Sequence, residues 1–122
     1  MSGEVRPAMV EAVRRCHERL KTAMLTNNWS HPVEVEGNPF DVLRNHFDVV
    51  VESSKVGIRK PEPAFYEMAC DLLEIEPSEA VFLDDIGANL KPARAMGMTT
   101  IKVTDPDEAL AELEAVVGFP LR

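Results

Sequence analysis

The feature that most constrains this chain is a regular alternation of helix-like and strand-like patterns along its length. The predicted strands are short runs of apolar and β-branched residues at 21–26, 47–51, 80–83 and 99–103. The predicted helices cover 7–20, about 39–45, a segment from Pro63 to Leu73, 88–96 and 106–117. Because helices separate consecutive strands, right-handed crossovers and a parallel sheet are expected. We therefore expect an α/β fold with a parallel, doubly wound sheet.

Local signals support the ends of several of these elements. Pro7 is suited to the first turn of a helix, and Gly97 is suited to the position just after one. Asp105 is predicted to cap the last helix, with Glu108 completing a capping-box-like pair. Residues 53–62 are polar and are expected to form a loop.

Size and charge exclude several classes of protein. The 122 residues correspond to one domain, which we expect to span 1–122, and the net charge is -8. An acidic chain without a basic stripe argues against nucleic acid and against an anionic membrane surface as partners. No apolar run is long enough to span a membrane, and the first residues lack a secretory pattern. With only two cysteines, Cys16 and Cys70, the chain is expected to be cytoplasmic.

Polar side chains follow the predicted strands where a parallel sheet would gather them. Thr26 and Asn27 end the first strand, Lys60 follows the second, and Asp84 and Asp85 follow the third. Ligands bind beyond the carboxyl ends of strands in such sheets. Taken singly, each residue has an ordinary structural explanation, such as a helix cap or a solvated charge. Their joint occurrence predicts a site for a phosphate and a cation.

Three segments carry a family resemblance. LTNNW (25–29), GIRKPEPAFYE (57–67) and VFLDDIGANLKPARAMGM (81–98) resemble the second, third and fourth motifs of the haloacid dehalogenase superfamily. The residues of these segments are most similar to the branch that contains the N-terminal phosphatase domain of soluble epoxide hydrolase. The resemblance extends from about Val5 to Phe119. It implies a three-layer, Rossmann-like parallel sheet and the hydrolysis of phosphoric monoesters.

The resemblance also assigns roles to the residues at the strand ends. It implies that Thr26 and Lys60 are catalytic and hold the phosphoryl group, with Asn27 beside the phosphate. It implies that Asp84 and Asp85 bind Mg²⁺. The implied substrate is a phosphorylated small molecule.

One further residue receives a supporting role from the same resemblance. Asn89 is implied to orient the acidic loop that carries the metal ligands. The chemistry is coherent, because a cation and a lysine offset the charge of a phosphoryl group that an aspartate attacks.

In the superfamily that the chain resembles, the first motif is a strand followed by Asp-x-Asp-x-Thr, and an aspartate of this motif attacks the phosphorus. This motif is absent from the sequence. The only Asp-x-Asp is Asp105-Pro106-Asp107, at the start of the last predicted helix. The cap that usually follows the first motif is absent too. We therefore expect an incomplete sheet of about four strands, whose central first strand is missing and leaves a gap of about 10 Å. The sheet is then rearranged, or it is completed by a homodimer partner or a complementing chain.

Two functions are compatible with this pattern. In the first, the chain is a fragment of a Mg²⁺-dependent phosphatase that is inactive alone because the nucleophilic aspartate is lacking. In the second, it is a non-catalytic module, derived from such a hydrolase, that binds phosphate or Mg²⁺ or serves in assembly.

Overall fold

The computed structural model describes residues 7–27 and 45–122. The described elements alternate between helices and strands as expected. In chain order they are α1 (Pro7–His17), β1 (Ala23–Thr26), β2 (Val49–Glu52), α3 (Ser53–Val56), α4 (Pro63–Leu73), the 3₁₀ helix η1 (Pro77–Glu79), β3 (Val81–Asp84), α5 (Gly87–Ala95), β4 (Thr99–Lys102) and α6 (Pro106–Val117). The predicted helix at about 39–45 lies almost entirely outside the described residues.

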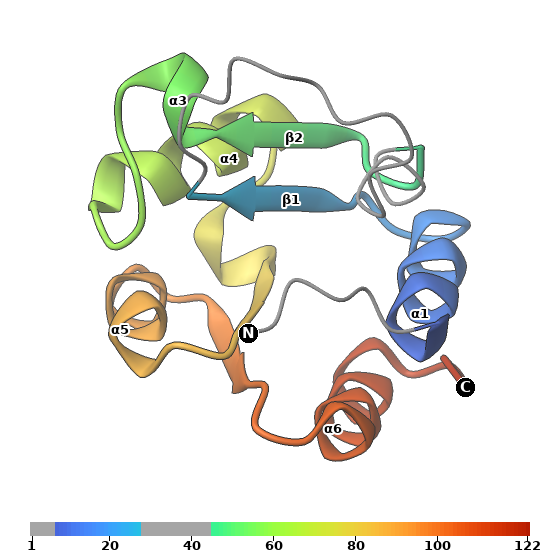
Figure 1. Ribbon diagram of the computed structural model, residues 1–122. Coiled ribbons are helices and arrows are strands. Elements are labelled where there is room, and N and C mark those ends of the chain that lie inside the picture. Colours follow the sequence, from blue (N-terminus) through green and yellow to red (C-terminus); the bar gives the residue numbers. More distant parts are fainter. Residues whose placement is uncertain (1–6, 28–44) are drawn as a thin grey trace.

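The strands form two separate parallel pairs. β1 pairs with β2, with Thr26 opposite Glu52, and β3 pairs with β4, with Asp84 opposite Lys102. Within 7–27 and 45–122, neither pair is hydrogen-bonded to the other. Figure 1 shows β1 and β2 side by side and pointing in the same direction. The expectation of a parallel, incomplete sheet is confirmed, and its four described strands stand in two separate pairs.

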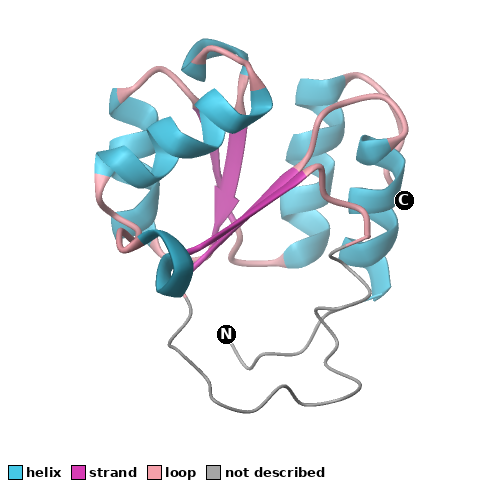
Figure 2. Ribbon diagram, turned by 90° about the horizontal axis from the view of Figure 1, so that it is seen from above, coloured by secondary structure: helices cyan, strands magenta, loops and turns pink. Residues whose placement is uncertain are grey.

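Helices cover both faces of the strands, as the view from above shows (Figure 2). One layer consists of α1 and α6, whose buried residues surround Ile101 of β4 in a shared apolar cluster. The other layer contains α4 and α5, which meet Phe82 of β3 through a second cluster. The result is a three-layer arrangement of helix, strand and helix.

Helix α4 links the two strand pairs. Tyr66 on this helix is fully buried, and it meets the ring of Phe82 edge-on, with 5.2 Å between ring centroids. Leu25 of β1 packs against the same cluster. A further cluster around Phe65 and Val51 joins α4 to β2. Burial of these apolar side chains contributes about 1.5–3 kcal/mol each, and so holds the two pairs in one body.

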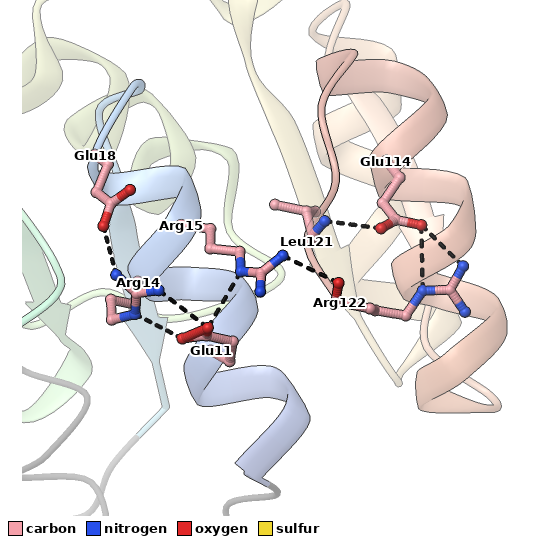
Figure 3. A network of polar contacts seen from close by, with 7 residues as sticks. All are labelled: Glu11, Arg14, Arg15, Glu18, Glu114, Leu121 and Arg122. Atoms are coloured by element: carbon pink, nitrogen blue, oxygen red, sulfur yellow. Dashed lines mark hydrogen bonds and ion pairs between the residues drawn. The ribbon is translucent and has the colours of Figure 1, made fainter.

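The chain's last residues pack beside the first helix (Figure 3). Leu121 is fully buried in the cluster between α1 and α6. Its amide donates to Glu114 Oε2 at 2.7 Å, and Arg122 Nη2 donates to Glu114 Oε1 at 2.9 Å. Arg15 Nη1 donates to the Arg122 carbonyl at 3.0 Å, which ties α1 to the tail. The hydrogen bonds that Glu114 accepts lower its pKa, and the amide of Leu121 contributes most.

Several element boundaries differ from the prediction. α1 ends at His17 rather than at residue 20, because the amides of Arg19 and Leu20 both bond to the Cys16 carbonyl in an irregular turn. The predicted loop 53–62 contains the short helix α3. Gly57, at φ 76°, ends this helix, and its amide bonds to Ser53. A four-residue polar helix has no apolar periodicity by which the sequence could reveal it.

The predicted helix caps are largely confirmed. Gly97 follows α5 with φ 102°, a left-handed conformation that glycine adopts readily. Asp105 caps α6 by accepting a hydrogen bond from the Glu108 amide at 3.3 Å. A reciprocal capping box is found at η1, between Glu76 and Glu79. In the described part of the chain, no helix has the length and apolar character that a membrane span requires.

Candidate phosphate and metal site

The candidate site lies at the carboxyl ends of β1 and β3. Thr26 is the last residue of β1 and is half-buried, and Asn27 follows it directly. Asp84 is the last residue of β3 and is buried, and Asp85 beside it is half-buried. Lys60 comes from the connection between α3 and α4. Three segments that are far apart in the sequence therefore meet at one edge, as the parallel topology predicts.

An ion pair between Lys60 and Asp84 joins two of these segments. The Nζ of Lys60 lies 2.9 Å from Asp84 Oδ2, and the two side chains are 13% and 5% exposed. The ammonium also lies 5.9 Å from the ring centroid of Phe82. Burying both charges costs desolvation energy, which only close, hydrogen-bonded pairing offsets. The geometry satisfies that condition.

Two further donors bind the Asp84 carboxylate. The Ile86 amide donates to Oδ1 at 2.9 Å, and Asn89 Nδ2 donates to Oδ2 at 3.2 Å. Burial alone would raise the pKa of Asp84. The Ile86 amide and the Lys60 ammonium outweigh this effect, so the pKa lies below its ordinary value. Asp84 is therefore held as a carboxylate.

The resemblance assigned Asn89 to orienting the acidic loop, and Asn89 is itself held in place by Tyr66. It is buried on α5, and its carbonyl accepts a hydrogen bond from the Tyr66 hydroxyl at 2.6 Å. Burial, together with the nearby charge of Asp84, raises the pKa of Tyr66 to about 12. Sequence reasoning did not single out Tyr66, because its position on the apolar face of α4 indicates only core packing.

Asn27 reaches the lysine-bearing loop directly. Its Nδ2 donates to the Lys60 carbonyl at 3.0 Å, and the Lys60 amide donates to its Oδ1 at 2.9 Å. Of the residues predicted for the site, hydrogen bonds thus join Asn27, Lys60, Asp84 and Asn89 in one network. Thr26 and Asp85 reach the same edge as the chain neighbours of Asn27 and Asp84.

The donor set suits a hard divalent cation. Mg²⁺ is usually bound by one or two carboxylates, with water and phosphate oxygens as the other ligands. Asp84 and Asp85 supply such carboxylates, and the oxygens of Asp84 keep lone pairs beyond those its three donors use. The residues present therefore fit the ion. Among the described residues, no group of three or more His, Cys, Asp or Glu side chains gathers around one point.

Comparisons with known sequences agree with the motifs. The family model of haloacid dehalogenase-like hydrolases matches residues 1–97. The mouse acyl-CoA dehydrogenase family member 10 is 47% identical over 116 residues, which are 94% of this chain and 11% of that protein. The pig bifunctional epoxide hydrolase 2 is 44% identical over 118 residues, covering 94% of this chain and 21% of that protein. The chain thus spans about a fifth or less of the length of these relatives.

Solved structures share the fold. A phosphatase from Thermococcus onnurineus superposes with a TM-score of 0.77 at 22% identity, over 98% of this chain and 60% of that one. An uncharacterised protein from Corynebacterium glutamicum gives a TM-score of 0.74 at 24% identity, over 92% of this chain and 80% of that one. An enzyme from Bacteroides thetaiotaomicron, solved with magnesium and inorganic phosphate, gives 0.65 at 18% identity, over 80% and 52% of the two chains.

Proposed function

Because the chain belongs to the haloacid dehalogenase-like hydrolase family, we propose that it forms the phosphate- and magnesium-binding part of a phosphatase. In this proposal residues 1–122 are one partial core domain, and the substrate is a phosphorylated small molecule. The Bacteroides enzyme of the same fold, solved with magnesium and inorganic phosphate, supports this choice of ligands.

The observation that carries the proposal is the buried ion pair between Lys60 and Asp84. A mostly buried lysine, 13% exposed, and a buried carboxylate, 24 residues apart, meet at the edge where a parallel α/β sheet binds its ligands. Asn27 bonds to the Lys60 backbone, and Asn89, itself held by the Tyr66 hydroxyl, donates to Asp84. Replacing a buried ion pair by well-packed apolar residues is often neutral or stabilising, so stability alone does not account for this pair. Its position at the ligand-binding edge supports a role in binding.

The phosphoryl group is bound by Lys60 and Thr26. The Lys60 ammonium carries three N–H donors, one of which Asp84 accepts, so it can keep that contact and donate to a phosphoryl oxygen. Thr26 is the last residue of β1, and its hydroxyl supplies a second donor. Asn27 adjoins the phosphate.

Asp84 and Asp85 are the proposed magnesium ligands, and Asn89 keeps Asp84 in position. When bound, Mg²⁺ offsets the negative charge of the transferring phosphoryl group. The lowered pKa of Asp84 ensures that this carboxylate is ionised at neutral pH.

The nucleophile comes from outside the residues described above. The sequence has no Asp-x-Asp-x-Thr motif, and in its only Asp-x-Asp the first acid caps α6. Within residues 7–27 and 45–122, the pairs β1–β2 and β3–β4 are not hydrogen-bonded to each other, so the described sheet is incomplete. We place a strand carrying the aspartate between β1 and β3, supplied by a homodimer partner or a complementing chain. Without it, the expected turnover is nil.

The cysteines are consistent with the cytoplasmic location we propose. Cys16 and Cys70 are both buried and free, and burial raises the pKa of each thiol. Buried thiols of this kind are unreactive packing groups, which suits a reducing compartment.

Calorimetric titration of the chain with orthophosphate, with and without Mg²⁺, tests the binding site. Lys60→Ala should weaken phosphate binding about tenfold, the value of one charge-assisted hydrogen bond. Asp84→Asn should abolish the effect of Mg²⁺ on phosphate affinity. Lys91→Ala and Asp107→Asn, at exposed positions on α5 and α6, are the matched controls. Equal affinities for the site variants and their controls would remove Lys60 and Asp84 from the site.

A phosphatase assay tests the assignment of the nucleophile. With 4-nitrophenyl phosphate and Mg²⁺, the chain alone should give no turnover. Turnover that Asp84→Asn abolishes would show that a nucleophile is present after all. If phosphate binds and a complementing first-motif segment restores no turnover, the chain is instead a phosphate-binding or assembly module.

A further inference from the structure

We propose that the side chain of Asn27 is a positioning residue, which acts on the phosphate site by fixing the backbone of Lys60. This role rests on the proposed function, and it differs from a direct side-chain contact with phosphate. In this role Asn27, the first residue after β1, sets the position of Lys60.

The side chain of Asn27 forms two hydrogen bonds with the backbone of Lys60, and we call this pair of bonds the clasp. Asn27 Nδ2 donates to the Lys60 carbonyl at 3.0 Å, and Asn27 Oδ1 accepts from the Lys60 amide at 2.9 Å. Both polar ends of the side chain are thereby committed to one residue. The amide plane must lie against the Lys60 backbone, which leaves only one N–H of Asn27 for any ligand.

The clasp connects the strand edge to an irregular segment. Lys60 lies between Gly57, which ends α3, and Pro63, which begins α4, so regular hydrogen-bond ladders do not hold its backbone. Within the described residues, a turn from Arg59 to Glu62 is the other backbone hydrogen bond that spans Lys60. Asn27 therefore transfers the rigidity of β1 to the base of the lysine side chain.

The other end of the same lysine is fixed by Asp84. Its ammonium lies 2.9 Å from Asp84 Oδ2, and the side chain is 13% exposed. With its backbone held at Asn27 and its ammonium held at Asp84, Lys60 spans the distance between the ends of β1 and β3. Loss of Asn27 would free the backbone end and let the long side chain lose its defined position.

The first test measures the clasp without any ligand. In a ¹⁵N-labelled chain, the Lys60 amide should exchange with solvent slowly, and Asn27→Ala should speed this exchange about tenfold, the equivalent of one lost hydrogen bond. Asn27→Asp keeps the acceptor for this amide and should retain most of the protection. Asn45→Ala, at an exposed asparagine, is the matched control. If the exchange rate of the Lys60 amide is the same in Asn27→Ala as in the parent chain, the proposed hydrogen bonds do not hold the Lys60 backbone.

The second test asks whether the clasp reaches the ammonium. Limited acetylation with acetic anhydride, read by mass spectrometry, should label Lys60 several-fold faster in Asn27→Ala than in the parent chain. Exposed Lys91 should label equally in both. Asn27→Asp, which lacks the donor to the Lys60 carbonyl, should give an intermediate rate. Equal labelling of Lys60 in all chains would show that Asn27 does not position it.

A double-mutant cycle on orthophosphate affinity then separates positioning from direct contact. If Asn27 acts through Lys60, Asn27→Ala weakens binding in the parent chain and has no further effect in the Lys60→Ala background. An equal loss in both backgrounds would overturn the proposal in favour of a direct contact. If the parent chain binds no phosphate, the proposed function fails, and the exchange and labelling measurements still decide whether Asn27 positions Lys60.

Discussion

Replacing Lys60 by methionine removes one partner of a buried ion pair and leaves Asp84 charged in the interior. Breaking such a pair typically costs about 3–5 kcal/mol. Asp84 keeps the Ile86 amide at 2.9 Å and Asn89 Nδ2 at 3.2 Å. These donors solvate part of the charge, so we expect a loss of about 2–3 kcal/mol in the free energy of unfolding at pH 7. With a urea m-value of about 1.5 kcal/mol/M, the midpoint should fall by about 1–2 M.

The pH dependence identifies the cause of this loss. In the parent chain the pKa of Asp84 is lowered, so its contribution to stability is full above the ordinary carboxyl pKa and is lost as the pH falls through the lowered value. In Lys60→Met the ammonium no longer opposes the effect of burial, so the pKa of Asp84 rises. Protonation then relieves the buried charge, and the deficit relative to the parent chain should narrow as the pH falls from 7 towards 4.

Urea unfolding followed by far-ultraviolet circular dichroism measures both quantities. Lys91→Met, at an exposed position on α5, is the matched control and should change stability by less than about 0.5 kcal/mol. The double variant Lys60→Met/Asp84→Asn removes both charges and should recover more than half of the loss. The reasoning is refuted if Lys60→Met and Lys91→Met unfold at the same urea concentration, or if the deficit is the same at pH 7 and pH 4.5.

Three further predictions follow from other parts of the structure. Leu121→Ala leaves a cavity at a fully buried position between α1 and α6 and should lower the free energy of unfolding, measured in urea, by about 2–4 kcal/mol. Val116→Ala, at a position that is 47% exposed, should lower it by less than about 1 kcal/mol. Equal losses would contradict the packing of the tail between the two helices. Tyr66 is the only tyrosine, and its ultraviolet titration in the folded chain should have a midpoint near 12, falling to about 10 in urea; a midpoint near 10 in the native chain would refute its burial. Asp105→Ala removes the cap of α6 and should lower the free energy of unfolding by about 1 kcal/mol, while an unchanged urea midpoint would show that the cap contributes nothing.

The order of the elements was predictable because each depends on a local pattern. The apolar face from Phe65 to Leu73 predicted α4, and Asp105 with Pro106 predicted the start of α6, where the structure begins it. Cap residues and apolar periodicity act over a few positions, so neighbouring residues suffice to reveal them. The helix α3 was not predictable, because SSKV has neither periodicity nor an apolar face.

The proximity of the candidate residues was predictable, but the hydrogen bonds between them were not. Thr26, Asn27, Lys60, Asp84 and Asp85 follow strands of a parallel sheet, and the topology alone brings strand ends to one edge. Which donor meets which acceptor depends on side-chain directions and on the path of the loop after α3. The sequence therefore left open that the Asn27 amide contacts the Lys60 backbone.

By itself, the sequence determined the α/β class, the parallel direction of the strands and the family, since these follow from periodicity and from three ordered motifs. It also determined that the first motif is absent. Only the tertiary structure decided that β1–β2 and β3–β4 stay separate within the described residues, that Tyr66 supports Asn89 and that Asp84 accepts from Lys60, Ile86 and Asn89. The physical reason is range: local patterns act through adjacent residues, whereas strand pairing and buried polar contacts join groups that only the folded chain brings together.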